Sequence, residues 1–525
     1  ARDTDYTDIY AKAVKLNAGL WAKNLSVITG KNKVAYATGK VQEVLDKQAT
    51  GISLDVAALG GMYAHKIALV VTAQGLGVNT EGAITADQLS VDQEGHIINS
   101  GKMLSREELN LKTNAELSNQ GELQSNGKVA IESNQKLTNT GSIYGTGAVA
   151  LKAGDDIANT GTVQSSNTLN LETGATFTNS GKLKSNEDMN IKAIKDFANT
   201  GALQSNAALE INASGNLTNA EDLQSNESMH IVTAKNFTNT GALQSNRALE
   251  INASGNLTNA GDLQSNEALD IKAVGDITNT GKTQSVAELA LHTGGNLNNL
   301  QGSMTAGGVW LTASGQIVNT GEVQSTKELH AKAGQEFYNK KNLRSNGAMV
   351  LDSAQDFSNT GTIGSGGTLS IQSLRFVNDN KAQLSREGLQ VKADEVINSK
   401  AKLVSGKDTY VSGINLTNTG DILGQDNVTL IGTTGFANLK TIASGKELKV
   451  ASQGKVHNTD NLYSGTAMDI ACDADLINLG QINSSGAITI NSQKAVYNKK
   501  QISGATVVTI TSTQYLVNED VMQSQ

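Results

Sequence analysis

The residues best suited to catalysis or metal binding are six histidines and one cysteine, spread over 525 residues. Such side chains act as metal ligands, bases or nucleophiles only when several converge on one site. His230 and His330 hold equivalent positions in the 20-residue repeat described below, five repeats apart. At about 4.8 Å per stacked strand, about 24 Å would separate them, which excludes a shared metal ion. We therefore expect the histidines to be solvated surface residues. They are His65, His96, His230, His292, His330 and His457.

Carboxylates are abundant, but their pattern does not indicate an active site. Glycoside chemistry needs two carboxyl groups roughly 5 to 10 Å apart in a cleft. A solenoid builds a cleft from loops of irregular length, and the regular repeat spacing in this chain leaves no such loops. No calcium-binding GGxGxD repeat occurs, and the glycine cluster at 364–367 lacks the lysine of a phosphate-binding loop. The sequence therefore predicts a protein that is not an enzyme, with no catalytic residues, no metal site and no cofactor.

Two tryptophans are the remaining candidates for a contact site. Trp310 lies between Val309 and Leu311, in an outward column that holds charged residues such as Glu210 in other repeats. An outward tryptophan can anchor a partner or a sugar ring, or it can lie across neighbouring strands. Trp310 is therefore the one candidate surface contact. Trp21 lies in an apolar stretch, and we expect it in the core.

The elements that position these residues are set by a repeat. Twenty-three asparagines recur from Asn79 to Asn518 at intervals of 20 residues, with one interval of 19 between Asn359 and Asn378. Such a period indicates a solenoid, in which each unit covers its neighbour. Thr or Ser and then Gly often follow the Asn, and Asn and Gly both accept left-handed corner conformations. Stacked amides can also hydrogen-bond along the axis. We expect one corner column with a structural role, not a ligand site.

Each repeat carries three short apolar segments. Counted from the Asn, apolar residues lie four, ten and twelve positions after it and two before the next Asn, as in Leu203, Leu209, Ile211 and Leu217. The spacing of two is strand alternation, and no stretch keeps helical spacing. The sequence therefore predicts an all-β fold, a right-handed, three-sided parallel β-helix (solenoid) with about 20 residues per coil.

The same spacing assigns the interior columns. All seven phenylalanines stand two residues before a repeat Asn, so one column accommodates the rings. Cys472 occupies a slot, six before the Asn, that usually holds a small residue such as Ala213. We expect a small buried filler and not a reactive thiol. Between about 380 and 418 the pattern shifts, since Lys402 falls on an apolar position and Leu403 follows it. This predicts a local register adjustment.

Composition fits stacked strands and limits the partners. The chain has no proline, where average usage gives about 26, and proline cannot donate to a strand ladder. The net charge is −8 with mixed signs and no basic stripe, so nucleic acid is not an expected partner. There is neither a run of about 20 apolar residues nor a signal peptide. The chain begins with Ala1, and we expect it to be a piece of a longer protein.

Residues 1–78 lack the 20-residue ladder, and two segments there carry a specific resemblance. LNAGLWAKNLSVITGKNKV (residues 16–34) and LDVAALGGMYAHKIALVVTAQGLGVNTEG (residues 54–82) resemble the segment after the secretion domain in filamentous haemagglutinin and the contact-dependent growth inhibition exoproteins. The repeats behind them resemble that family's haemagglutinin repeats. We expect a head at 1–78, which follows the secretion domain and begins the β-helix, and a haemagglutinin-repeat β-helix shaft at 79–525.

The resemblance implies two-partner secretion by a Gram-negative bacterium, in which an outer-membrane transporter exports a long chain that folds into a filament. The implied location is secreted, at the bacterial cell surface and associated with the outer membrane. The implied partners are that transporter, acting through the secretion domain, and a target-cell receptor contacted by regions outside this chain. We expect this chain to be the shaft without the secretion domain or a toxin.

Two functions remain open. One is a rigid filament shaft that presents receptor-binding and toxin regions in contact-dependent growth inhibition. The alternative is a host-cell adhesin of the filamentous haemagglutinin type, which binds a receptor or glycan through its lateral faces. An adhesive face should show an apolar patch in register over several coils. The column seven residues before the repeat Asn is instead mixed, which favours the shaft. That column includes Lys192, Asn212, Val232, Asn252, Lys272, His292 and Thr312.

Overall fold

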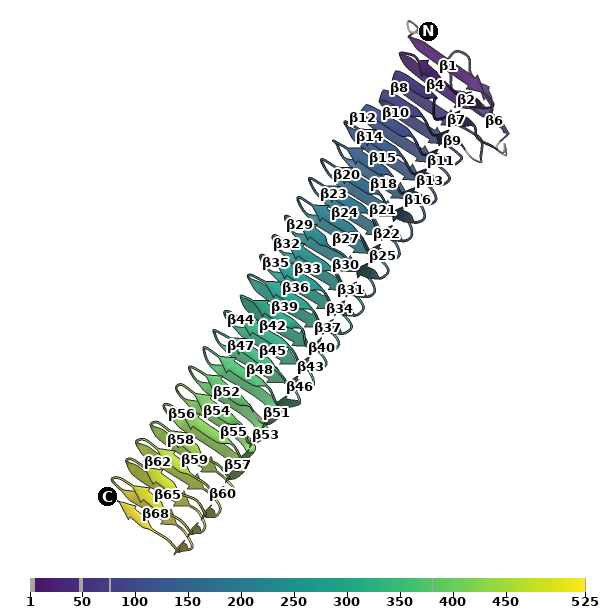
Figure 1. Ribbon diagram of the computed structural model, residues 1–525. Coiled ribbons are helices and arrows are strands. Elements are labelled where there is room, and N and C mark those ends of the chain that lie inside the picture. The colour runs from purple at the N-terminus through teal and green to yellow at the C-terminus, as the bar shows by residue number, and fades with distance from the viewer. Residues whose placement is uncertain (1–4, 47–50, 75–76, 380, 525) are drawn as a thin grey trace. The chain divides into compact units, whose positions relative to one another are not determined.

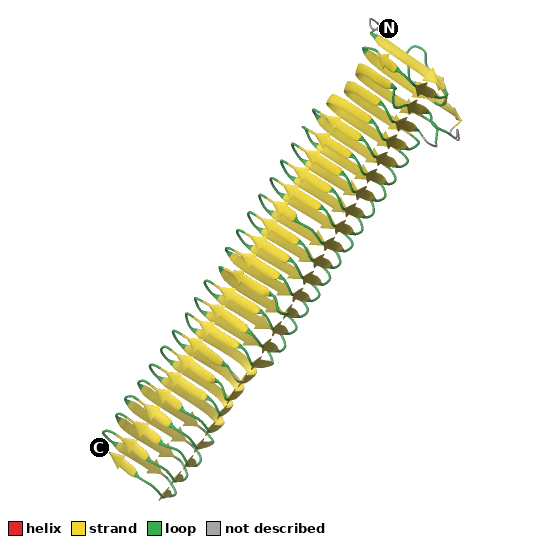
Figure 2. Cartoon of the chain, viewed as in Figure 1, coloured by secondary structure: helices red, strands yellow, loops and turns green. Residues whose placement is uncertain are grey.

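The computed structural model describes residues 5–46, 51–74, 77–379 and 381–524. Every regular element in these ranges is a β-strand, numbered β1 to β70 (Figures 1 and 2). Among these residues there is no helix long and apolar enough to cross a membrane. The chain divides into two compact units, residues 1–256 with 260–266 and residues 257–259 with 267–525. Each unit is a parallel β-solenoid.

A regular coil of the first unit contributes three strands, such as β16 (Leu137–Asn139), β17 (Ser142–Gly145) and β18 (Val149–Ala153). Each strand pairs in parallel with the strand three places later, and the paired residues are 20 apart, as Leu137 and Ile157 are. The predicted all-β parallel solenoid with about 20 residues per coil is therefore confirmed. Its right-handedness and three-sided cross-section stay predictions.

The second unit repeats this arrangement, with one group of coils in which two strands merge. A regular coil there consists of β43 (Ile317–Asn319), β44 (Glu322–Ser325) and β45 (Leu329–Ala333). In the merged coils the third strand runs on into the first strand of the next coil. In three of the four, the corner between them is one residue shorter: 378 − 369 = 9, against 359 − 349 = 10 in a regular coil. The merged strands are β51 (Leu369–Asp379), β53 (Leu389–Ser399), β55 (Thr409–Asn418) and β57 (Val428–Asn438).

Parallel pairing already begins within the head. β1, β4, β8 and β10 pair in parallel in this order (Figure 1). Between β4 and β8 in the sequence, β5 and β6 form an antiparallel pair of their own. The bounds are Tyr6–Ala11 for β1, Asn24–Thr29 for β4, Lys31–Val34 for β5, Val41–Asp46 for β6, Gly61–Val71 for β8 and Ala83–Gln93 for β10.

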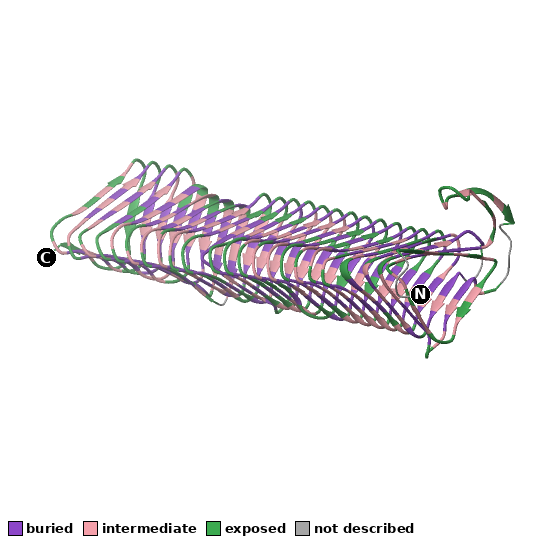
Figure 3. Cartoon of the chain, turned by 90° about the horizontal axis from the view of Figure 1, so that it is seen from above, coloured by how far each residue is buried: buried purple, intermediate pink, exposed green. Residues whose placement is uncertain are grey.

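Strand alternation places the core inside the coils (Figure 3). In β27 (Leu209–Ala213), for example, Leu209, Ile211 and Ala213 are buried and the residues between them are at least partly exposed. All seven phenylalanines are at most 2 % exposed, as predicted. Phe177 pairs with Phe197, and their ring centroids are 5.4 Å apart. Because full burial of a large apolar side chain contributes about 1.5 to 3 kcal/mol, these columns supply most of the stabilisation within each coil.

The asparagines form buried ladders within each unit. The side-chain amide of each donates to the amide oxygen of the next, at 2.7 to 2.9 Å from Asn99 to Asn239. In the second unit the same bonds run from Asn259 to Asn518 at 2.7 to 3.1 Å. The predicted hydrogen bonding between stacked amides is confirmed.

Asn79, however, is not part of the ladder. Asn99 pairs with Thr80, and Asn79 pairs with Ile98 instead. Side chains alternate faces along a strand, so the buried Thr80 takes the ladder position and Asn79 faces outward, where its Nδ2 donates to Asp55 at 2.9 Å. The prediction for Asn79 was wrong because a corner one residue shorter imitates the 20-residue spacing.

The corner glycines have a different role from the one predicted. Among the described residues only Gly30, Gly39 and Gly51 have a glycine φ in the left-handed region, so the repeat glycines do not need it. A Cβ added to Gly161 would instead lie 2.0 Å from the carbonyl oxygen of Gly141. Stacked corners approach too closely for a side chain, and this contact explains the recurring glycine.

Register adjustments occur where a corner gains one residue. Gln301 and Lys400 have φ values of 64° and 54°, which places an extra residue after the ladder Asn in the left-handed region. After Lys400 the interior position passes to Leu403, which is fully buried, while Lys402 is exposed and forms an ion pair with Asp421 at 3.5 Å. The adjustment predicted between 380 and 418 is confirmed.

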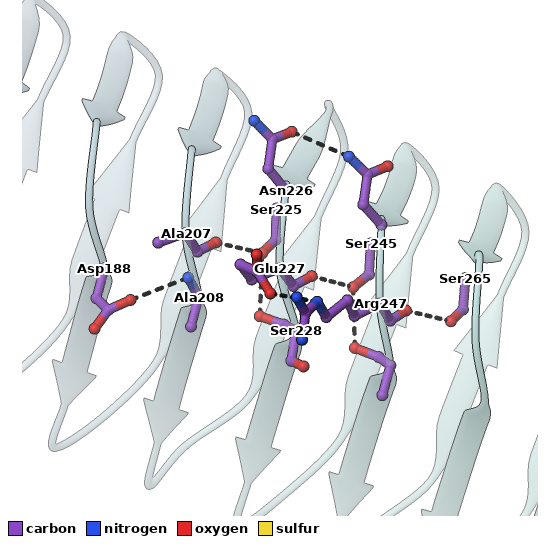
Figure 4. Close-up of polar contacts among 12 residues, drawn as sticks. Asp188, Ala207, Ala208, Ser225, Asn226, Glu227, Ser228, Ser245, Arg247 and Ser265 are labelled. Carbon is purple, nitrogen blue, oxygen red and sulfur yellow. Dashed lines mark hydrogen bonds and ion pairs between the residues drawn. The ribbon is translucent and has the colours of Figure 1, made fainter.

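Serine hydroxyls fasten the corner between the second and third strands of each coil, a feature not predicted. The Oγ of Ser225 donates to the carbonyl of Ala207 at 2.8 Å, and Ser245 donates to Glu227 at 2.7 Å (Figure 4). The recurring Gln-Ser-Asn triplet, present at 204–206 and 224–226, is the sequence signal that could have revealed this column. Each hydroxyl satisfies a corner carbonyl, which a buried corner requires.

Candidate functional site

The histidines lie apart from one another and contact single carboxylates. His65 is 2.6 Å from Asp87, His230 is 3.8 Å from Glu250, and His330 is 3.2 Å from Glu328. Within the described ranges, no group of three or more His, Cys, Asp or Glu residues could hold a metal ion. These pairs are exposed or half-buried contacts, and exposed pairs contribute little to stability.

Trp310 faces outward but lies flat on its neighbours. It pairs with Ala290 and His330, and its ring stacks on the His330 ring at 5.8 Å between centroids and 6° between planes. A Cβ on Gly308 would lie 2.1 Å from the indole, so the ring occupies the space above that glycine. Trp310 is half-buried, and its role as a surface contact stays a proposal.

Trp21, expected in the core, is 48 % exposed, so that prediction was wrong. It lies outward above Gly19 and stacks on Tyr63 at 5.4 Å between ring centroids. The apolar stretch around it does not alternate clearly, and strand pairing decides the face. Leu20 pairs with the fully buried Met62, which leaves Trp21 on the opposite side.

Cys472 occupies the predicted interior slot. It is 3 % exposed, pairs with Ser452 and Ser492, and its Sγ donates to the carbonyl of Ala474 at 3.1 Å. Burial raises the pKa of the Cys472 thiol, and the neighbouring Asp473 adds to the shift. Thiolate is the reactive form, so both access and ionisation disfavour reaction.

We therefore expect Cys472 to remain unlabelled by a maleimide in the folded protein over a period in which urea-denatured protein labels completely. Cys472→Ala should cost about 1 kcal/mol or less, since Ala213 and Ala273 fill the same slot. Mass spectrometry of the labelled protein measures the first and denaturant unfolding the second. Complete labelling of the native protein would show that the thiol is accessible.

The structure reveals a lateral apolar surface that was not predicted. Leu384, Val404, Leu423, Ala443 and Tyr463 pair consecutively along one outward column. In the first unit this column holds glutamines, including Gln204, Gln224 and Gln244. We call the five residues the apolar strip. They lie on β52 (Ala382–Ser385), β54 (Lys402–Ser405), β56 (Asp421–Gly424), β58 (Ile442–Ser444) and β61 (Leu462–Ser464).

A surface hollow of about 720 Å³ opens at one end of the apolar strip. Gly364 pairs with Arg344 on one side and Leu384 on the other, so its missing side chain leaves a gap between a guanidinium and a leucine. Gly366 and Gly406 extend the floor along the corner, Arg386 and Val404 stand beside it, and the amides are Gln324, Asn346 and Gln425.

The two arginines of the hollow carry uncompensated charge. In the described part of the chain neither Arg344 nor Arg386 has an ion pair, although both are exposed. Nearby lysines are paired: Lys407 with Glu387, and Lys446 with Asp426 at 2.7 Å. These carboxylates raise the pKa of both lysines through hydrogen bonding and charge. The hollow is therefore a local cationic site with an apolar side.

The strand that borders this hollow breaks the rule of apolar residues inward. Gln383 is fully buried, and neither polar atom of its side chain has a hydrogen-bond partner. Leu384 beside it is 46 % exposed. The extra corner residue after Asn378 produces this exchange, and the constant spacing of the asparagines hides it in the sequence. Reading every outward column, rather than one, could have found the strip.

Comparison with known proteins gives the family. Haemagglutinin repeats match residues 27–121, 105–172, 160–221, 220–301 and 473–520. Over 107 residues the chain is 37% identical to Toxin CdiA of Yersinia pestis, and over 102 residues 37% identical to tRNA nuclease CdiA-2 of Burkholderia pseudomallei. It is 42% identical over 77 residues to 16S rRNA endonuclease CdiA of Enterobacter cloacae.

The matched segments cover 20%, 19% and 14% of this chain, respectively. They span only 3%, 3% and 2% of the three relatives. No solved structure matches the chain. The resemblance to filamentous haemagglutinin repeats and to contact-dependent inhibition exoproteins is confirmed.

Proposed function

Because this chain belongs to the haemagglutinin-repeat family, we propose that it is part of the filament shaft of a CdiA-like exoprotein. Its work would be reach and presentation: it would hold receptor-binding and toxin regions away from the cell surface. Export through an outer-membrane transporter of a Gram-negative bacterium, by two-partner secretion, and a secreted or cell-surface location belong to the same proposal. So does the division into a head at 1–78 and a shaft at 79–525.

The observation that carries the proposal is the uniform coil. In the first unit, strand pairs repeat at a spacing of 20 residues from β11 (Ile97–Asn99) onwards, as Ile97 with Leu117 and Leu137 with Ile157 show. Such stacks gain about 4.8 Å per coil with only nearest-neighbour contacts. A unit of this kind supplies length at constant cross-section, which is what a spacer requires.

The test is a two-coil deletion in the full exoprotein. Removing residues 200–239 joins Asn199 to Thr240, and the Thr-Gly-Ala-Leu-Gln-Ser-Asn that follows is the same as at 200–206. We expect an exported filament shorter by about 10 Å that still inhibits target cells, because a spacer tolerates a small loss of reach. Growth competition and target-cell binding measure the outcome.

Removing residues 200–229 is the matched control, since it takes out one and a half coils and breaks the pairing register. This variant should lose folding and export. If the 200–239 deletion is exported and folded but no longer binds target cells, the adhesin alternative replaces the shaft proposal for that region.

A further inference from the structure

We infer that the hollow beside the apolar strip binds an acidic saccharide, with the sugar carboxylate between Arg344 and Arg386 and an apolar ring face against Leu384 and Val404. This binding activity goes beyond the proposed shaft function. The site lies entirely in the second unit, in residues 324–425, apart from the coils removed in the deletion test.

The first argument is the exchange of Gln383 and Leu384. Burying an amide without partners and exposing a leucine both oppose folding. Where a strand breaks the local rule in this way, a functional site is the expected reason. The exchange lies in the strand that lines the hollow, and its result is an aliphatic wall facing solvent. The wall has a use if a ligand packs on it.

The second argument is charge. Guanidinium groups bind carboxylates through paired, charge-assisted hydrogen bonds. Surface cations elsewhere near the strip already have carboxylate partners, as Lys407 and Lys446 do, whereas Arg344 and Arg386 have none among the described residues. Two unpaired guanidiniums on either side of a glycine floor therefore provide a place for one carboxylate.

The third argument separates a saccharide from a peptide. β50 (Thr362–Ser365) and β52 pair in parallel with neighbours on both sides, so the floor offers no free strand edge to which a peptide could add. A bound peptide would leave most of its backbone groups without protein partners. A sugar ring instead offers hydroxyls to the amides of Gln324, Asn346 and Gln425 and keeps its remaining hydroxyls in water.

The experiment titrates the folded protein with three probes, using calorimetry: trigalacturonic acid, the neutral maltotriose and the tripeptide triglutamate. Trigalacturonic acid should bind, and each of the other probes should bind about tenfold more weakly or less. No binding of trigalacturonic acid would overturn the inference. Equal binding of maltotriose would remove the role of charge, and equal binding of triglutamate would show general attraction of carboxylates.

Variants then locate the site. Arg344→Ala with Arg386→Ala should weaken trigalacturonic acid binding about tenfold or more, whereas Arg247→Ala, a surface arginine of the first unit paired with Glu227, should not change it. The exchange variant Gln383→Leu with Leu384→Gln should raise the unfolding temperature while weakening binding. Unchanged affinity in the arginine variant, or a lowered unfolding temperature in the exchange variant, would contradict the inference.

Discussion

Replacing Asn139 with alanine should lower the free energy of unfolding of its coil by about 2 to 5 kcal/mol. Asn139 is fully buried, accepts a hydrogen bond from Asn119 at 2.8 Å and donates one to Asn159 at 2.7 Å. Alanine leaves the donor of Asn119 and the acceptor of Asn159 buried without partners, and each such group costs about 1 to 3 kcal/mol. Denaturant unfolding and hydrogen exchange of the amides in β16 measure the loss.

Asn134 provides the matched control. Its side chain also donates to the asparagine of the preceding coil, Asn114, at 2.6 Å, but both side chains are exposed. Water replaces that bond when Asn134 becomes alanine, so we expect a change within about 0.5 kcal/mol. Equal losses for Asn139→Ala and Asn134→Ala would show that the buried ladder contributes nothing beyond surface amide contacts.

Inserting one alanine between Glu210 and Ile211 should unfold that coil. Leu209, Ile211 and Ala213 are buried on one face of β27. A one-residue shift within a strand sends the residues after it to the opposite face, so Ile211 would become exposed and Asn212 buried. Exposing isoleucine costs about 1.5 to 3 kcal/mol, and burying an unpaired amide costs at least about 1 to 3 more. Loss of hydrogen-exchange protection in β27 and its neighbours is the expected readout.

The matched insertion is a glycine between Ala220 and Glu221, in the corner after Asn219. The chain already carries an extra residue at this corner position in the second unit, Gln301 and Lys400, both with positive φ. Glycine adopts that conformation at no steric cost, so strand pairing on either side should persist. If the corner insertion is as damaging as the strand insertion, the corners are not the tolerant points of the coil.

The sequence was sufficient for the fold because the coil repeats its physical requirements. Alternation in Leu209 and Ile211, the phenylalanine column and the asparagine spacing each require stacked parallel strands. Asn79 was misassigned because spacing alone does not report the face of a strand, and pairing places Thr80 inward. The corner glycines were found, but the close approach of stacked carbonyls, which explains them, depends on coordinates in three dimensions.

The lateral surface was harder to predict. The corner after Asn378 gains a residue while the next asparagine stays 20 positions away, so the exchange of Gln383 and Leu384 leaves no trace in the period. Arg344 and Gly364 become neighbours of Leu384 only once that register is known. Trp21 was assigned to the core from hydrophobicity, and only its pairing with Tyr63 shows that it faces outward. Cys472 was predictable because its slot follows the regular period.

The most direct test of the stacked-coil account is a set of spin-label distances within the first unit, in a Cys472→Ala background. Asn114, Ile194, Ala234 and Ser254 are exposed and occupy one column, so cysteine pairs of Asn114 with each of the others span four, six and seven coils. Pulsed dipolar spectroscopy should give distances of about 19, 29 and 34 Å, rising by about 4.8 Å per coil. Distances that do not increase in proportion to the number of coils would contradict the account.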